Sequence, residues 1–182
     1  EMCEGEIEQI NSIGDTSIGL RHYLRRIQRK TAFLISACCA IGAMVGNGSS
    51  DLIWHLKKYG YCLGMAFQIT DDILDFIGSE DVMGKPVGSD LRQGIITIPV
   101  IYALQDRLRG PRLQDIINKD IKTENDWDEA FSIIEDTGAL NASQQLCDRY
   151  LQKAKDKLHY LPDLPPRQIL VALTDFIAIR NF

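Results

Sequence analysis

A short segment near the middle of the chain reads Phe67-Gln68-Ile69-Thr70-Asp71-Asp72-Ile73-Leu74-Asp75. Apolar side chains recur through it at the spacing of an α-helix. At about 100° per residue, the amide and the three carboxylates of the segment fall within an arc of about 100° on one helix face. The segment therefore predicts a helix that is mostly apolar and carries one acidic face.

Two interpretations of that acidic face compete. Acidic helix faces are commonly solvated, but a solvated face would carry Lys or Arg in the next turn, where this chain has Phe76 and Ile77. An EF-hand loop is excluded because its Asp/Asn alternation, its glycine and its final Glu are missing. Crowded carboxylates repel one another unless a cation lies opposite, and Mg²⁺ takes one or two carboxylates together with phosphate oxygens. The pattern favours a magnesium–diphosphate site at Asp71, Asp72 and Asp75.

Composition narrows the class of protein. A chain of 182 residues can bury one substantial core, and 45% apolar with 25% charged residues is typical of a soluble globular domain. The net charge of −5, without a basic cluster interleaved with aromatics, argues against nucleic-acid binding. The cationic stretch from Arg21 to Lys30 is interpreted, apart from Lys30, as mostly a solvated helix face.

The cysteines and the longest apolar run bear on the compartment. Five cysteines without a C-x-x-C spacing argue against a zinc site or a disulfide framework and favour a reducing cytoplasm. The run from Ala32 to Val45 is too short to span a bilayer and contains Ser36 and Gly42. It predicts a buried core helix, and no transmembrane segment is expected.

Strand signals are almost absent, so we expect a single all-α domain built as a helical bundle. Gly60 and Gly64 lower helix propensity and are expected to permit close helix packing, and Ser50 or Asp51 is expected to cap the helix that contains them. The Gly-rich connection over 79–94 is long enough to suggest a functional loop. The expected helices cover residues 1–10, 18–45, 50–78, 95–108, 113–117, 127–137, 139–158 and 168–179.

Two lysines add to the carboxylates. Lys30 and Thr31 precede the apolar run, and Lys85 lies in the glycine-rich loop. Taken alone, Lys30 is more typical of a side chain that runs along apolar surface with its ammonium in water, and a lone Lys in a loop is weak evidence. Taken with three carboxylates, the two lysines would let Mg²⁺ and ammonium groups share the charge of one diphosphate.

Five motifs in order resemble those of the trans-polyprenyl diphosphate synthases. The likeness runs along the whole chain and is greatest to the heptaprenyl-forming branch, in which a catalytic subunit works with a small non-catalytic partner. The motifs are Gly5-Glu6-Ile7-Glu8-Gln9, Arg29-Lys30-Thr31-Ala32, the segment 67–75, Gly84-Lys85-Pro86-Val87-Gly88-Ser89-Asp90-Leu91 and Thr97-Ile98-Pro99-Val100-Ile101-Tyr102-Ala103-Leu104.

The resemblance implies an isoprenoid-synthase bundle around a central cavity. It also implies Mg²⁺-dependent condensation of an allylic diphosphate with isopentenyl diphosphate, giving a long all-trans product, expected to be heptaprenyl. Asp71, Asp72 and Asp75 match the second aspartate-rich motif of the family. Asp71 is thereby implied as the direct metal ligand, and the other two as partners of metal-bound waters or lysines.

Further roles follow from the same resemblance. Lys30 and Lys85 match the pair that grips the allylic diphosphate. Thr31 and Gln68 would direct oxygen dipoles toward the developing allylic cation. Asp90 matches a loop carboxylate beside the substrate.

The chain also departs from the family pattern. Many members carry a lysine at the position of Ile95, and residues 1–60 supply neither a first metal-binding Asp cluster nor a basic site for isopentenyl diphosphate. We therefore expect the chain to be the C-terminal half of a synthase and to be inactive alone. A small non-catalytic subunit or a second copy is the expected partner. A class I terpene cyclase and a non-catalytic synthase subunit remain as alternatives.

Overall fold

The computed structural model describes residues 2–78 and 86–179. Over these residues the chain forms helices and no strand, so the predicted all-α class is confirmed. In chain order the elements are α1 (Met2–Asn11), α2 (Leu20–Ile27), the π-helical turn η1 (Gln28–Ala32), α3 (Phe33–Val45), α4 (Ser50–Ile77), α6 (Ser89–Arg92), α7 (Ile98–Leu104), α8 (Gly110–Ile117), α9 (Glu124–Asp136), α10 (Ala139–Leu158) and α11 (Pro165–Ala178).

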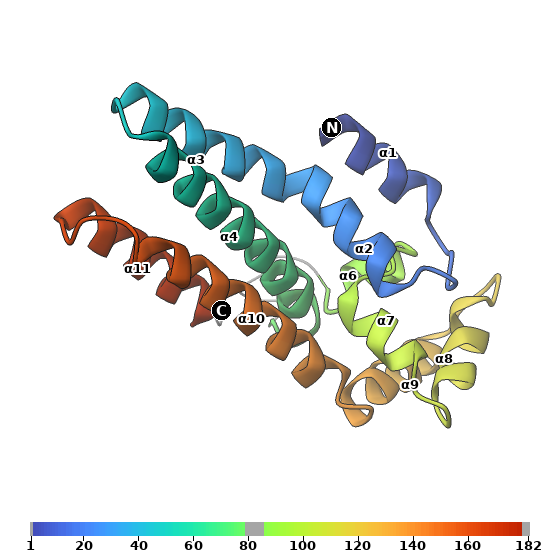
Figure 1. The fold of residues 1–182 in the computed structure, drawn as a ribbon. Helices are drawn as coiled ribbons and strands as arrows, with labels where there is room; N and C mark the ends of the chain where they lie inside the picture. The colour runs from blue at the N-terminus through green and yellow to red at the C-terminus, as the bar shows by residue number, and fades with distance from the viewer. Residues whose placement is uncertain (1, 79–85, 180–182) are drawn as a thin grey trace.

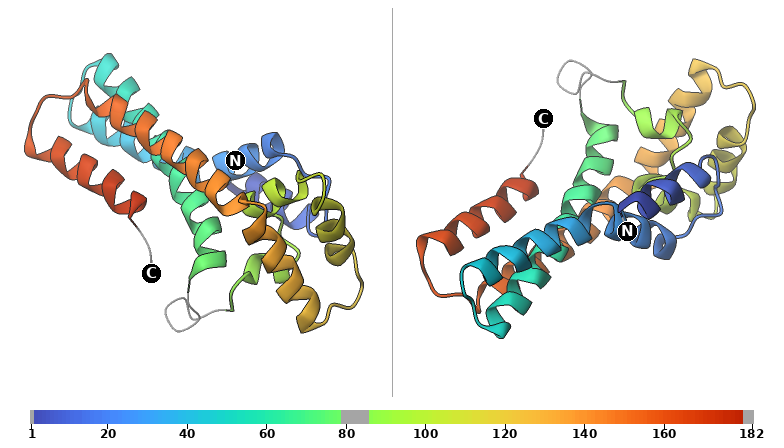
Figure 2. Two further views of the ribbon diagram at one scale, coloured as in Figure 1. Left: turned by 90° about the horizontal axis from the view of Figure 1, so that it is seen from below. Right: turned by 90° about the horizontal axis from the view of Figure 1, so that it is seen from above.

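The long helix α4 is the centre of the bundle. It packs against α3 on one side and α10 on the other, and α11 folds back beside α10 (Figure 1). The shorter helices α7, α8 and α9 gather at the opposite end from the α3–α4 turn (Figure 2). Met65, Ala66 and Ile69 of α4 are completely buried. The helix that carries the acidic face is thus also the one that the core is built on.

Two glycines set the distance between α4 and the helices before it. A Cβ atom on Gly64 would lie 2.7 Å from Ala32 Cα, and one on Gly60 would lie 2.7 Å from Cys39 Sγ. Contacts under 3.0 Å are not tolerated by real Cβ atoms, so only glycine permits this approach. The predicted role of both glycines in close helix packing is confirmed.

The helix predicted over 18–45 begins at Leu20 and is interrupted by the π-helical turn η1. Helix α1 packs directly on this turn, where a Cβ on Gly5 would lie 2.8 Å from the Lys30 backbone nitrogen. Single π-helical turns inside helices are frequent at functional sites. The residues of η1 have ordinary helix propensities, so the sequence alone carries no sign of the turn.

Helix α4 begins at Ser50 as predicted, but its N-cap is not one of the two predicted residues. Its N-cap is Ser49, whose hydroxyl accepts a hydrogen bond from the Leu52 N–H at 3.2 Å, rather than Ser50 or Asp51. All three residue types are good N-caps, so propensity does not distinguish between them.

Prolines begin helices in this chain more often than they end them. Pro99 lies in the first turn of α7, as predicted, although the helix expected over 95–108 is shortened to α7. Pro111 lies in the first turn of α8, and Pro165 and Pro166 open α11, so both helices begin earlier than predicted. A proline at the first helical position has no N–H to leave unpaired and a suitable φ.

The run 32–45 is helical, as predicted, but the prediction that it is a buried core helix is wrong. Only one face of α3 is buried, through Ser36, Ala40 and Ala43. Ile41 and Val45 on its other face are 58% and 78% exposed. Burial against α4 accounts for one side of the helix and leaves an apolar strip on the surface of the described chain.

None of the helices within residues 2–78 and 86–179 has the length and apolar character needed to cross a membrane.

The close approach at Gly64 generates a stability prediction. Gly64→Ala should lower the free energy of unfolding by about 1–3 kcal/mol, because the added methyl group meets the Ala32 backbone. The matched control is Gly42→Ala in α3, where nothing lies within 4 Å of the added Cβ. That change should raise the free energy of unfolding by about 0.5–1 kcal/mol through helix propensity. Urea unfolding of both variants checks this, and equal stabilisation by the two alanines would contradict it.

Candidate functional site

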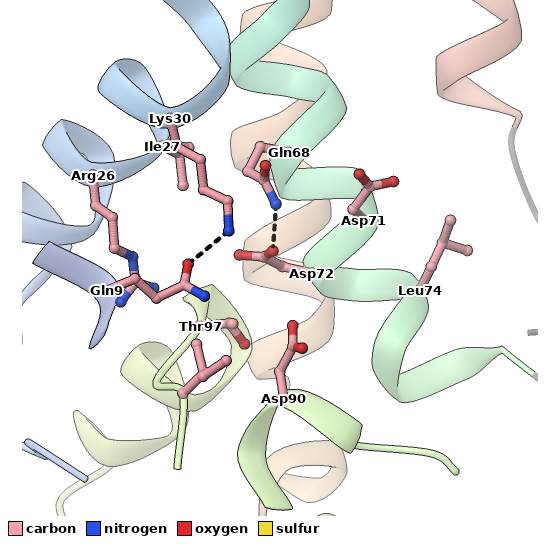
Figure 3. A pocket seen from close by; sticks show the side chains of 11 residues that line it. Gln9, Arg26, Ile27, Lys30, Gln68, Asp71, Asp72, Leu74, Asp90 and Thr97 are labelled. Atoms are coloured by element: carbon pink, nitrogen blue, oxygen red, sulfur yellow. Dashed lines mark hydrogen bonds between the residues drawn. The ribbon is translucent and has the colours of Figure 1, made fainter. Parts of the chain in front are cut away.

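A pocket of about 280 Å³ lies between α1, α2, η1, α4 and the segment around α6 and α7. Two cations and three carboxylates line it, together with the amides of Gln9 and Gln68 (Figure 3). The charged residues are Arg26, Lys30, Asp71, Asp72 and Asp90.

The charges of the pocket are sorted onto two walls. Arg26 and Lys30 approach from α2 and η1 beside Gln9, whereas Asp72 from α4 and Asp90 from α6 face them (Figure 3). Asp71 also comes from α4, but its carboxylate projects away from those of Asp72 and Asp90 (Figure 3). The pocket thus offers N–H donors on one side and carboxylate oxygens on the other.

Asp72 is the most constrained carboxylate of the pocket. It is only 4% exposed, accepts a hydrogen bond from the Tyr23 hydroxyl at 2.8 Å on Oδ2 and one from Gln68 Nε2 at 3.1 Å on Oδ1. Burial raises the pKa of the Asp72 carboxyl to about 7, although both hydrogen bonds act in the opposite direction. A bound cation would remove the cost of keeping this group charged.

The tyrosine that holds Asp72 is itself deeply buried. Burial, followed by the neighbouring Asp72 charge, raises the pKa of the Tyr23 hydroxyl well above its usual range. The hydroxyl therefore keeps its proton and serves as a donor to Asp72.

Thr31 and Gln68 are brought together by the structure. Thr31 Oγ1 donates to Gln68 Oε1 at 2.9 Å, and the Gln68 amide donates in turn to Asp72. This chain of hydrogen bonds links η1 to α4 and fixes the Gln68 side chain at the pocket wall. Their predicted role toward an allylic cation stays a prediction.

Lys30 is held in place by the first motif of the chain. Its Nζ donates to Gln9 Oε1 at 3.0 Å and forms an ion pair with Glu6 Oε2 at 3.2 Å. The next residue back, Arg29, pairs with Glu8. Helix α1 therefore orients the cations of η1, and the absence of a side chain at Gly5 lets it come close enough to do so.

Asp75 lies behind the pocket rather than in its wall. It is 3% exposed, and its Oδ2 accepts the backbone N–H of Asp90 at 3.0 Å. The Gly88 N–H donates to the Asp75 backbone carbonyl at 2.7 Å. Asp75 thus fixes the start of α6 and, through it, the position of Asp90 at the pocket.

The donor chemistry of the pocket fits Mg²⁺. In the part of the chain that the structure describes, no three His, Cys, Asp or Glu side chains converge closely enough to enclose a metal ion. Mg²⁺ needs no such cage, because it keeps several waters and takes one or two carboxylates with substrate oxygens. Asp71, Asp72 and Asp90 supply such carboxylates at the pocket. The predicted metal role of Asp71, Asp72 and Asp75 stays a prediction, and Lys85 lies outside the described residues.

Arg26 is an exception to the predicted solvated face, on which Arg21 and Arg25 are exposed. It is 2% exposed, and its Nη2 donates to the Ile96 carbonyl at 2.7 Å. It lies four residues before Lys30, a spacing that places both on one helix face, and this spacing is the signal that could have revealed it. Tyr23, one turn earlier, was also missed as a functional residue.

Known proteins resemble this chain over all of its length. A family model described as Polyprenyl synthetase matches residues 1–134. Heptaprenyl diphosphate synthase component 2 of Bacillus subtilis (strain 168) is 43% identical over 185 residues, which cover 100% of this chain and 52% of that protein. The protein of the same name from Geobacillus stearothermophilus is 44% identical over 185 residues, covering 100% and 56%.

Solved structures agree with these relatives. Heptaprenyl diphosphate synthase from Staphylococcus aureus superposes with a TM-score of 0.92 at 33% identity, covering 100% of this chain and 57% of that one. A polyprenyl synthase from Caulobacter crescentus CB15, complexed with calcium and isoprenyl diphosphate, gives 0.90 at 34% identity, covering 99% and 56%. The chain spans about half the length of the curated relatives it matches.

The buried Asp72 carboxyl generates a pH prediction. Its pKa is 3.8 when unfolded and about 7 when folded, so between these values the folded state holds the extra proton. Stability contributed by that proton is therefore lost as the pH rises, by up to about 1.4 kcal/mol per pH unit.

Urea unfolding in EDTA across that pH window tests this expectation. Asp72→Asn should show a shallower loss of stability with rising pH than the parent chain. The exposed Asp120→Asn should follow the parent. The same pH dependence in parent and Asp72→Asn would show that Asp72 does not titrate in this range.

Proposed function

Because the chain belongs to the polyprenyl synthetase family, we propose that the whole protein is a trans-polyprenyl diphosphate synthase. It condenses an allylic diphosphate with isopentenyl diphosphate and makes a long all-trans product. The names of the relatives from Bacillus subtilis and Geobacillus stearothermophilus support a heptaprenyl product.

The observation that carries this proposal is the division of one pocket into a cationic and a carboxylate wall. A diphosphate bound with Mg²⁺ needs both, since its oxygens accept from cationic N–H groups while the metal takes carboxylate ligands. Lys30 stands on one wall, with Asp72 and Asp90 facing it. Asp71 and Asp72 are the proposed metal-binding side chains, and Asp75 supports them by holding Asp90. When bound, Mg²⁺ would draw negative charge from the diphosphate leaving group.

The chain's own residues act on the charge that develops as the substrate ionises. When the allylic C–O bond breaks, its electron pair goes to the diphosphate, and Lys30 donates more strongly to the oxygens that gain that charge. Such stabilisation is larger in the transition state than in the bound substrate, so it raises the rate. Gln68, held by Thr31 and Asp72, keeps a fixed amide beside the carbocation. The double bond of isopentenyl diphosphate attacks the cation, and the departing diphosphate takes the final proton.

We further propose that this chain supplies the C-terminal half of the synthase. The relatives are about twice as long, and the exposed apolar side chains of α3 support a covering by further residues of the whole protein. Those residues would provide the first Asp cluster and the isopentenyl diphosphate site. Lys85 is the proposed second lysine of the diphosphate site.

The partner and the alternatives follow from the same features. The designation "component 2" of both relatives supports a second, non-catalytic subunit, and a homodimer is the alternative.

The free cysteines support a cytoplasmic location of the protein. A terpene cyclase or a non-catalytic subunit is less well supported, because the motif around Lys30 and the carboxylates of α4 are both present at one pocket.

The first test of this function uses the whole protein with its partner. Labelled isopentenyl diphosphate, farnesyl diphosphate and Mg²⁺ should give a long-chain product whose length is read by chromatography. EDTA should abolish the product, and Asp71→Ala should lower the rate at least about 100-fold. Asp120→Ala, on the surface, is the control and should leave the rate unchanged. If Asp71→Ala forms product at the parental rate, Asp71 is not a metal ligand.

A second test concerns the 182-residue chain by itself. We expect it to fold but to give no steady-state product in the same assay, because half of the metal ligands and the isopentenyl site are lacking. Circular dichroism establishes that the sample is helical. Turnover by the folded chain alone would disprove the half-synthase proposal.

A further inference from the structure

Arg26 carries hydrogen-bond donors that the described chain does not use. Its Nη2 donates to the Ile96 carbonyl, but Nε and Nη1 are buried and have no hydrogen-bond partner among residues 2–78 and 86–179. The guanidinium carbon also lies 5.6 Å from the centre of the Tyr23 ring. One of the three donor nitrogens is thus satisfied by the fold, and two are left.

A buried cation in this state is costly. A guanidinium removed from water needs an anion or acceptors for its N–H groups. Among the described residues no carboxylate hydrogen-bonds to Nε or Nη1 of Arg26, although the charge of Asp72 acts on it from farther away. The cation–π contact with Tyr23 offsets only part of the lost hydration. The unused donors belong to a side chain that lines the pocket, so an anion in the pocket is the natural partner.

The position of Arg26 indicates which anion. It lies on the same wall as Lys30 and faces Asp72 and Asp90 across the pocket (Figure 3). Lys30 already shares its ammonium with Gln9 and Glu6, whereas two N–H groups of Arg26 are uncommitted. Ile95, which lines the pocket on the same segment as Ile96, brings no charge. Arg26 is therefore the cation of this wall with the most capacity left for phosphate oxygens.

We propose that Arg26 is a diphosphate-binding residue of the pocket, whose Nε–H and Nη1–H donate to the oxygens of a substrate diphosphate. Nη1 lies on the same side of the Nε–Cζ bond as Cδ, so its N–H groups and the Nε–H leave the planar guanidinium along different edges and donate to separate oxygens. The Ile96 carbonyl holds Nη2, so the side chain is oriented before substrate arrives. This inference rests on the proposed function and adds a binding residue to it.

The test measures binding of inorganic diphosphate with Mg²⁺ to the whole protein by calorimetry. Arg26→Met should weaken binding about 10- to 100-fold, because charge-assisted hydrogen bonds are lost. The matched control is Arg25→Met, the adjacent and exposed arginine of α2, which should bind as the parent does. Without diphosphate, the melting temperature of Arg26→Met should equal or exceed that of the parent, since an unpaired buried charge has been replaced by an apolar side chain.

A purely structural arginine would give the opposite pair of results. If Arg26→Met melts earlier than the parent yet binds diphosphate within about twofold of it, Arg26 serves only to hold Ile96 and the inference is wrong. Should Arg26→Met fail to fold, Arg26→Lys keeps the charge but loses the separate Nε–H and Nη1–H donors, and it must bind diphosphate more weakly than the parent. Parental affinity in Arg26→Lys would then overturn the inference.

The two proposals fail separately. If diphosphate binding depends on Arg26 but the protein has no prenyltransferase activity, the proposed function is refuted and the binding role of Arg26 still holds. If the protein is an active synthase whose diphosphate affinity is unchanged by substitution of Arg26, this inference is refuted and the proposed function still holds.

Discussion

Burying the Asp72 carboxylate in the central helix imposes a free-energy cost that the neighbouring helices are arranged to reduce. Tyr23 from α2 and Gln68 from α4 each donate to one of its oxygens, and Thr31 from η1 orients Gln68. These contacts require η1 and α4 to approach at backbone distance, which Gly64 permits. The packing of the core and the preparation of the pocket are therefore the same set of contacts.

The charges around Asp72 are kept apart by the secondary structure that carries them. Helix α1 and the π-helical turn hold Lys30 on one side, whereas the turn into α6 holds Asp90 on the other through the Asp75 carboxylate. Neutralisation among the described residues is incomplete, since the hydrogen-bond donors to Asp72 are neutral and Arg26 donates only to a carbonyl beside its contact with the Tyr23 ring. A ligand that brings both a cation and an anion would complete both walls at once.

Much of this could be predicted from the sequence, and the rest depended on tertiary contacts. Hydrophobic periodicity located α4 and gave α10 its exact limits, because long amphipathic helices are strongly patterned. The burial of Arg26 could not be predicted from composition. It depends on the Tyr23 ring one helical turn before it and on the Ile96 carbonyl, which the fold brings close from 70 residues away. Helical spacing placed Asp75 with its acidic neighbours, but it could not show that the Asp75 carboxylate accepts the N–H of Asp90, fifteen residues later in the chain.

The central claim is that the two walls bind one metal–diphosphate unit. A crystal structure of the whole protein with Mn²⁺ in place of Mg²⁺ and with inorganic diphosphate tests it most directly, because anomalous scattering locates the metal. The account predicts the metal on the side of Asp71 and Asp72 and diphosphate oxygens within hydrogen-bond distance of Lys30. Metal and diphosphate bound elsewhere, with this pocket holding only water, would contradict it.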